Sequence, residues 1–413
     1  MKKSLIALAA LASTGAFAQT AAMTITGGID LAYRAVSHED PTKKVTGVTN
    51  NGSYTSQLDF AGKYDLAGGT SAGFFMELDF NPQISAQANQ NSLGFGGTPF
   101  TGQQMVYLGG GFGTVRLGVP NSPGLTAGVT AQPLGTAIGS GYGNGFGRLG
   151  TTNASGVNSY EGNGPGRIIR HEKTLQYTTP NLDGVTATVE FAAKNYNANT
   201  AAATATAAAT TASTSNTNGY FGLAAAYNKG PVNAIIFSGK ATAGDNTGST
   251  ARASGGTTIG DTTTAGSSAL TASNNALTLG SSVKWMMLAG NYAIDNSLTV
   301  YAGYTTTKGE TAAGTKLEDS KSQNVAVKYN VDQFELMANV LTRTSNLTAA
   351  NAATASQAQD LGLKATLIGL GANYNLSSKV TVYGRYETVK NATVTTTVAQ
   401  KQTTTAAGVK VLF

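Results

Sequence analysis

Apolar and polar residues alternate with a period of two along many segments of this chain. Between residues 23 and 33 the apolar set includes Met23, Ile25 and Ile29, and the residues between them include Thr24 and Asp30. The same period recurs over 58–66, 74–80, 185–191, 298–304, 325–329, 334–340 and 380–382. A period of two places successive side chains on opposite faces of a β-strand. The sequence therefore predicts an all-β protein whose strands each have one apolar face.

The pattern predicts sixteen strands, which begin near residues 23, 53, 70, 104, 114, 168, 184, 219, 232, 282, 298, 322, 333, 363, 379 and 402. Tight turns are predicted at 67–69, 111–113, 179–183, 229–231, 295–297, 330–332 and 375–378. Long connections are predicted near 37–52, 81–103, 119–167, 196–218, 242–276, 309–321, 345–362 and 391–401. Because short and long connections alternate, every turn lies at one end of an antiparallel meander. Short periplasmic turns and long extracellular loops are typical of a transmembrane β-barrel.

Charged residues on the predicted strands follow the parity that such a barrel requires. In a membrane barrel the apolar face points to lipid and the polar face to the lumen, whereas a soluble sandwich has the reverse. The residues expected to point inward are Asp30, Arg34, Asp59, Lys63, Asp65, Glu77, Asp79, Arg116, Arg170, Glu172, Glu190, Lys194, Lys328, Glu335, Arg343, Arg385, Glu387 and Lys410. Three lysines, Lys173, Lys284 and Lys364, break the parity, and we expect them near strand ends. We expect Trp285 and many tyrosines in the aromatic girdles at the membrane interfaces.

The two ends of the chain indicate export and assembly. A basic start, an apolar stretch from Leu5 to Ala12 and the small residues Ala16 and Ala18 predict a signal peptide over 1–18, with the barrel over 19–413. Apolar runs long enough for a membrane-spanning helix are absent from the sequence. At the C-terminus the last residue is Phe413, and a terminal aromatic residue is the signal that outer-membrane barrels present to their assembly machinery.

Sequence motifs spread along the chain resemble those of the Gram-negative general porins, specifically the β-proteobacterial trimeric family. They are the segments 26–30, 65–74, 113–118, 176–184, 374–379 and 382–384, together with the terminal Phe413. The resemblance implies a sixteen-stranded antiparallel barrel, a homotrimer set in outer-membrane lipid and lipopolysaccharide, and a third long loop folded into the lumen as a constriction. The second strand departs from the family, because Gln57 and Ala61 stand where arginines usually line the constriction.

The resulting functional hypothesis is an outer-membrane channel for passive diffusion of small hydrophilic solutes and ions. Sixteen strands leave a water-filled channel, and selectivity arises where the channel is narrowest. The expected constriction loop spans 120–167, with Arg148, Glu161 and Arg167 as its charged residues. The expected wall residues opposite it are Arg34, Lys63, Arg116, Arg170, Asp59, Glu77 and Asp79. Because the predicted lumen has as many basic as acidic residues, we expect a weak preference for anions at most.

Two other functions remain open at this stage. A substrate-selective channel would need an aromatic path or a dense basic cluster at the constriction, and neither is evident. A plugged barrel that acts as a surface adhesin is favoured only by the Ala- and Thr-rich stretches 197–218 and 242–276. No enzyme is expected. The two histidines are His38 and His171, and a serine hydrolase around His171 is conceivable, but no nucleophile-elbow motif accompanies any serine. No cofactor or metal is expected, and the net charge of +6 is too small and scattered for nucleic-acid binding.

Overall fold

A computed structural model describes residues 21–38, 44–50, 52–80, 82, 102–141, 170–171, 173–192, 219–242, 282–310, 313–347, 362, 364–392 and 400–413. The predicted signal peptide lies outside these residues, as do Arg148, Glu161, Arg167, Glu172 and Lys194. The described strands are β1 (Ala21–His38), β2 (Val45–Asn50), β3 (Gln57–Asp65), β4 (Ser71–Asp79), β5 (Gln104–Gly110), β6 (Gly113–Val119), β7 (Thr174–Thr178), β8 (Val185–Ala192), β9 (Gly219–Lys229), β10 (Val232–Thr242), β11 (Ser282–Ala293), β12 (Leu298–Glu310), β13 (Lys316–Val331), β14 (Phe334–Ser345), β15 (Lys364–Asn375), β16 (Val380–Ala392) and β17 (Gln400–Leu412). The helical elements are η2 (Ala67–Gly69) and α2 (Pro123–Thr130).

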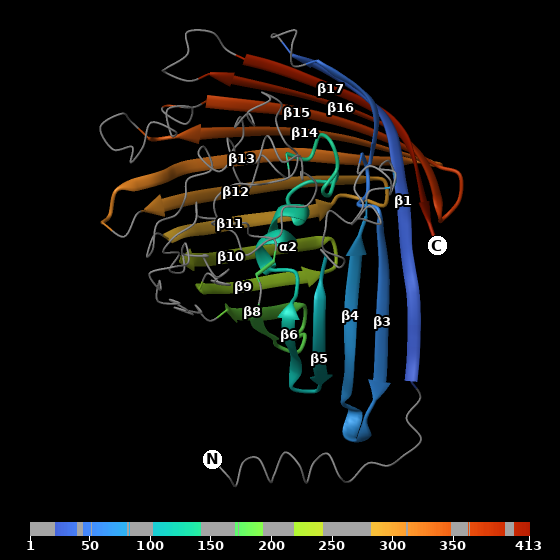
Figure 1. Cartoon of the computed structure of the whole chain (residues 1–413), viewed down its shortest axis with the longest axis vertical. Helices are drawn as coiled ribbons and strands as arrows, with labels where there is room; N and C mark the ends of the chain where they lie inside the picture. The colour runs from blue at the N-terminus through green and yellow to red at the C-terminus, as the bar shows by residue number, and fades with distance from the viewer. Residues whose placement is uncertain are drawn as a thin grey trace, which may run out of the picture.

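The strands form one antiparallel sheet that closes on itself as a barrel (Figure 1). Each strand from β3 onward pairs with the next along the chain, and β17 closes the ring by pairing with β1. The loop-side half of β1 pairs with β2, and its turn-side half pairs with β3. β2 and β3 therefore share one position, so seventeen segments make the sixteen-stranded barrel that the sequence predicts.

Three strand boundaries differ from the prediction. The second strand does not begin near residue 53, because residues 52–56 leave the wall between β2 and β3. The strand predicted near 168 begins at Thr174, since Lys173 has a positive φ of 56° and Arg170 pairs with Asn121 instead of a wall strand. The connection predicted as long over 309–321 is short, because β12 and β13 extend to Glu310 and back from Lys316.

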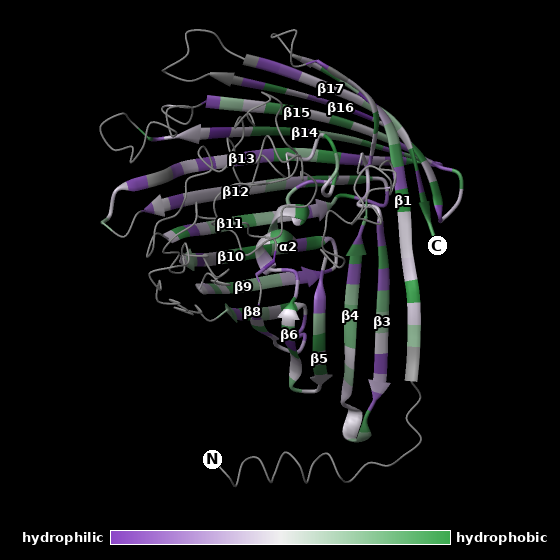
Figure 2. Ribbon diagram, viewed as in Figure 1, coloured by the Kyte–Doolittle hydropathy of each residue, from purple (hydrophilic) through white to green (hydrophobic). Residues whose placement is uncertain are grey.

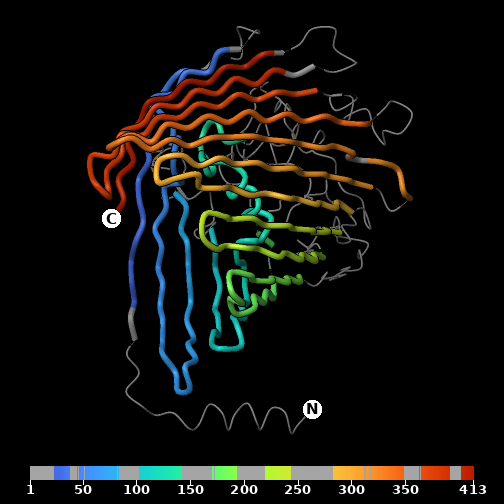
Figure 3. Tube along the Cα trace, turned by 180° about the vertical axis from the view of Figure 1, so that it is seen from behind, coloured from blue at the N-terminus to red at the C-terminus, as the bar shows by residue number. Residues whose placement is uncertain are grey.

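Short hairpins lie where they were predicted. The coloured tube in Figure 3 shows them following one rim of the barrel for the strands β9 to β16. Gly230 and Asp332 adopt positive φ values of 59° and 51° in two of these turns. Tight hairpin turns require positive φ, which glycine, asparagine and aspartate tolerate best.

The outward face of the barrel is apolar and bordered by aromatic residues. Hydropathy alternates along the strands (Figure 2), and the outward side chains of Val325, Leu288 and Met23 are 68%, 57% and 67% exposed. Four tyrosines lie on this face near the turns, as expected for an interfacial girdle, namely Tyr227, Tyr292, Tyr329 and Tyr374. The prediction for Trp285 is wrong, because its side chain is 2% exposed and lies in a buried cluster on the inner face. Among the described helices, none is long and apolar enough to cross a bilayer.

Candidate functional site

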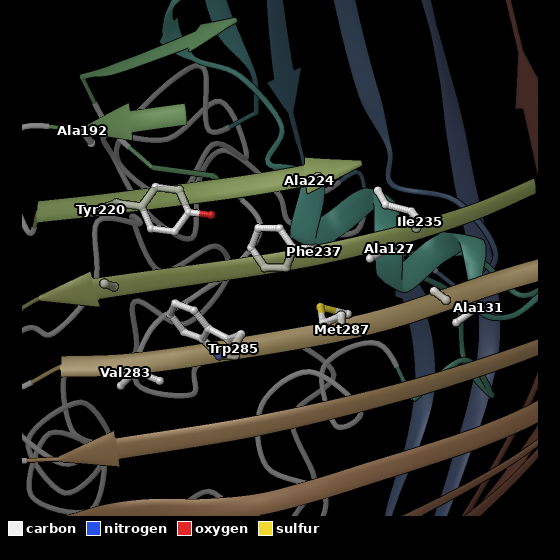
Figure 4. Packing of buried hydrophobic residues seen from close by; sticks show 12 residues of the cluster. Ala127, Ala131, Ala192, Tyr220, Ala224, Ile235, Phe237, Val283, Trp285 and Met287 are labelled. Carbon is white, nitrogen blue, oxygen red and sulfur yellow. The ribbon is translucent and has the colours of Figure 1, made fainter. Parts of the chain in front are cut away.

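The third long connection enters the barrel directly after β6. Ser122 caps the first turn of α2, since its hydroxyl accepts a hydrogen bond from the Gly124 N–H at 3.0 Å. α2 then lies against the inner face of β10 and β11 (Figure 4). Ala127 and Ala131 meet the inward side chains of Phe237 and Met287 there, and all four are at most 4% exposed. Burial of these small and apolar side chains seats the helix on one wall of the lumen.

Glycines on the inner wall make room for the rest of the described loop. A Cβ at Gly369 would lie 2.0 Å from the Gly139 carbonyl oxygen, and one at Gly371 would lie 2.6 Å from the Leu134 side chain. A Cβ at Gly303 would lie 2.7 Å from the Cβ of Ala131. Each distance is shorter than heavy-atom contact permits, so the loop can approach the wall this closely only where side chains are absent.

Amide and carboxylate side chains of the wall hold the loop in place. Asn324 donates to the Ala131 carbonyl at 2.6 Å, and Asn291 donates to the Thr130 carbonyl at 3.1 Å. Asn339 donates to the Gly139 and Ser140 carbonyls at 3.1 and 3.2 Å, and Glu387 accepts from the Gly139 N–H at 2.9 Å. These bonds satisfy loop backbone groups that would otherwise be buried without partners. The third loop is therefore fixed across β11, β13, β14 and β16, and its constriction position over 120–141 is as predicted.

Residues 52–56 are also drawn into the lumen. The Asp30 carboxylate, which is fully buried, accepts hydrogen bonds from the Ser53 N–H at 2.6 Å, from the Tyr54 N–H and from the Tyr383 hydroxyl. Arg385 donates to the Ser53 hydroxyl at 2.6 Å. This network explains why the chain leaves the wall between β2 and β3.

A cluster of three carboxylates lies on β3 and β4. Asp59 and Glu77 are directly opposite each other in register, and Asp79 follows on the same face. All three are at most 8% exposed. Arg170 forms an ion pair of 2.9 Å with Glu77, and Gln57 donates to both oxygens of Asp59 at 3.0 and 2.9 Å. The three acidic groups and one arginine leave this part of the wall net negative.

The carboxylate cluster lies across the lumen from the constriction helix. With β2 and β3 counted as one position, β3 and β11 are eight positions apart in a ring of sixteen. α2 packs on β11, so the helix and the cluster bound opposite sides of the lumen. Two further arginines lie at other depths of the wall. Arg34 lies on the loop side of β1, opposite Gly47 of β2 and Ala406 of β17. Arg116 lies on the turn side of β6, in one row with Tyr107, Gly73 and Lys63, and donates to Gln176 and Thr178 at 3.2 and 3.0 Å.

The predicted wall residues therefore separate into two groups. Asp59, Glu77, Asp79 and Arg170 come together, whereas Arg34 lies on the loop side of them and Arg116 on the turn side, in register with Lys63. Lys63 lies apart, near the turn after β3, where it pairs with Asp65 at 2.8 Å and both side chains are more than half exposed. The wall amides Asn291, Asn324 and Asn339 were missed by the sequence analysis. Their only signal is an amide at an inward position, which a water-filled lumen would equally accept.

Comparison with known proteins agrees with this geometry. Residues 4–333 and 286–394 match the Gram-negative porin family. This chain belongs to that family. The porin is 29% identical over 236 residues to outer membrane porin protein 32 of Delftia acidovorans. This match covers 57% of this chain and 59% of that protein. It is 30% identical over 201 residues to the major outer membrane protein P.IB of Neisseria gonorrhoeae. This match covers 47% of this chain and 49% of that protein. The matches thus span 49% to 59% of the length of these relatives.

Solved structures share the fold of this porin over nearly its whole length. An anion-selective porin from Comamonas acidovorans superimposes with a TM-score of 0.67 at 20% identity, covering 95% of this chain and all of the other. OmpT of Vibrio cholerae with its loop L8 deleted gives a TM-score of 0.61 at 15% identity, with 95% and 99% of the chains covered. The family and the barrel together locate the porin in the outer membrane.

Proposed function

We propose that this porin forms a water-filled channel for passive diffusion of small hydrophilic solutes and ions. The observation that carries the proposal is the third loop, which is hydrogen-bonded across the lumen while charged and amide side chains line the wall around it. A barrel of sixteen strands is wide enough to keep an aqueous passage beside such a loop. Solutes would move down their own gradients and be sorted by size and charge at the loop. No enzymatic role and no cofactor is part of the proposal.

Selectivity in this channel would come from opposed wall charges of nearly equal number. The carboxylates Asp59, Glu77 and Asp79 would attract cations, and Arg170 beside them, with Arg34 and Arg116 at other depths of the wall, would attract anions. Balanced charges favour a weak ion preference, in the direction of anions at most. Arg148, Glu161 and Arg167 of the third loop are proposed to add to this balance.

The assembly is proposed to be a homotrimer in a membrane of lipid and lipopolysaccharide. Its insertion is proposed to use the C-terminal strand as the signal for the barrel-assembly machinery. Phe413 donates its backbone N–H to the Gly27 carbonyl at 3.1 Å, so the terminal residue also takes part in closing the barrel.

Single-channel recording of the purified protein in a planar bilayer tests the pore and its assembly together. We expect conductance steps in groups of three, and a small reversal potential under a salt gradient. A bilayer that stays silent although inserted protein is demonstrated would refute the diffusion pore. A liposome-swelling assay then separates a plugged barrel, which admits no sugar, from a substrate-selective channel, which admits one class of solute.

A further inference from the structure

The segment 52–56 enters the lumen beside the third loop, and its backbone is fixed on both sides of Tyr54. The Asp30 carboxylate accepts a hydrogen bond from the Tyr54 N–H. After Tyr54, the Ser56 hydroxyl accepts from the Asp30 N–H at 3.0 Å, and the Ser56 carbonyl accepts from the Phe80 N–H at 2.9 Å. These bonds join the segment to β1 and to the end of β4, so the wall determines where Tyr54 lies.

The ring of Tyr54 lies on the inner face of β1. Gly28 has the same inward parity as Asp30, and a Cβ at Gly28 would lie 3.0 Å from Cε1 of the Tyr54 ring. The charges of the carboxylate cluster on β3 and β4 are near enough to act on the Tyr54 hydroxyl. Tyr54, whose side chain is partly exposed, is therefore on the side of the lumen that lies opposite α2.

The segment 52–56 also meets the third loop. The Ile138 N–H donates a hydrogen bond to the Gly52 carbonyl at 3.3 Å. Ile138 and Tyr383 belong to one buried cluster on the inner wall, and a Cβ at Gly52 would collide with the Tyr383 hydroxyl. The two inward elements therefore lie at the same depth, and together they border the lumen from α2 round to the carboxylate cluster.

A large side chain on a fixed backbone limits the width of a passage more than a flexible one does. Tyrosine is large and has only two side-chain torsions, so the fixed backbone leaves the ring of Tyr54 little freedom to move aside. The width of a channel and the groups that line it decide which solutes pass. Because Tyr54 is uncharged, its ring restricts the size of a solute, whereas the neighbouring carboxylates act on its charge.

We propose that Tyr54 sets the upper size of the solutes that pass, because its ring forms the edge of the narrowest section that faces α2. The inference rests on the proposed diffusion channel and adds the residue that limits solute size in it. The segment 52–56 then acts as a second constriction element, joined to the third loop at Gly52 and Ile138. Sorting by size and sorting by charge are carried out by neighbouring but different residues.

The test is a liposome-swelling assay with a pentose, arabinose, and a disaccharide, sucrose. Wild type, Y54A and Y54W are compared with the control Y107A. Tyr107 of β5 also points inward and lies over a wall glycine, since a Cβ at Gly73 would be 2.5 Å from its hydroxyl oxygen, but it is on the turn side. Y54A and Y107A therefore remove the same side chain from the same kind of packing, and only Y54A does so beside the third loop. Heat-modifiable gel mobility shows that each barrel is folded.

We expect Y54A to raise the swelling rate with sucrose relative to arabinose by about threefold, and Y54W to lower it by a similar factor, because passage depends on the narrowest width. Y107A is expected to keep the wild-type ratio. A wild-type ratio in both Tyr54 variants, or the same change in Y107A as in Y54A, would overturn the role of Tyr54 while the diffusion channel stands. A folded wild type that admits neither sugar would overturn the channel itself, and this inference with it.

Discussion

The carboxylate cluster offers a quantitative test of how wall charge sets selectivity in this porin. The change D59N/E77Q removes two negative charges that face each other on β3 and β4 and keeps the size of both side chains. Gln57 can still hydrogen-bond the new amide at position 59, and Arg170 loses its ion-pair partner at 2.9 Å. The local net charge thus rises by two without a change in the path of the backbone.

The magnitude follows from Coulomb's law in water. A unit charge about 6 Å from a permeating ion contributes roughly 0.7 kcal/mol at a dielectric constant of about 80. Screening at about 0.1 M salt, where the Debye length is about 10 Å, leaves roughly 0.4 kcal/mol per charge. Removing two charges changes the free energies of a permeating monovalent cation and anion in opposite directions. The summed difference of about 1.5 kcal/mol corresponds to roughly a tenfold change in the permeability ratio.

The assay is the reversal potential of single channels under a tenfold salt gradient. We expect D59N/E77Q to move it toward anions by the equivalent of about a tenfold change in permeability ratio. The matched control is D183N/D332N, which removes two carboxylates in turns at positive φ of 54° and 51°, where asparagine is well tolerated. A reversal potential that stays the same in both variants would refute the idea that ions pass within a few ångströms of the cluster.

Three further changes test the loop, the lipid face and the C-terminus. N324A removes the hydrogen bond of 2.6 Å to the Ala131 carbonyl. Loss of one such bond destabilises the loop position by about 1 kcal/mol, so brief closures of single channels should become about fivefold more frequent. N375A, near a turn, is the control and should leave the closures unchanged. V325R places a cation on the lipid face, midway between Tyr329 and Lys321. An arginine at the bilayer midplane destabilises a barrel by about 2–4 kcal/mol, so the refolding yield in gel-shift assays should fall. T306R, two residues from the exposed Lys308 on β12, should cost little, and equal yields of V325R and T306R would contradict the membrane placement. F413A should reduce folded porin in cells more than it reduces refolding of purified protein in detergent, and an equal loss in both would argue for a purely structural role of the last residue.

The sequence alone determined the barrel, because the lipid face, the lumen and the turns each leave a local signal. Period-two patterning marked the strands, the turn residues marked the hairpins, and the parity of Asp30, Asp59 and Glu77 marked the inner face. These signals come from neighbouring residues, so they can be read without knowing which strands meet. The boundaries were wrong where long-range bonds override the local pattern, as at residues 52–56, which Asp30 and Arg385 draw into the lumen.

The contacts of the inner face depend on how the closed barrel and the third loop come together. A lone tryptophan is expected at a membrane interface, yet Trp285 is buried inside the barrel, in the cluster that also contains Ala127 and Ala131 of the third loop. Gly369 and Asn339 gain their roles only when the loop lies against them, 230 and 200 residues away from Gly139 in the chain. Lys240, Lys284 and Lys308 likewise become neighbours only when β10, β11 and β12 pair. Contacts between residues so distant along the chain depend on the closed sheet, and no local pattern encodes them.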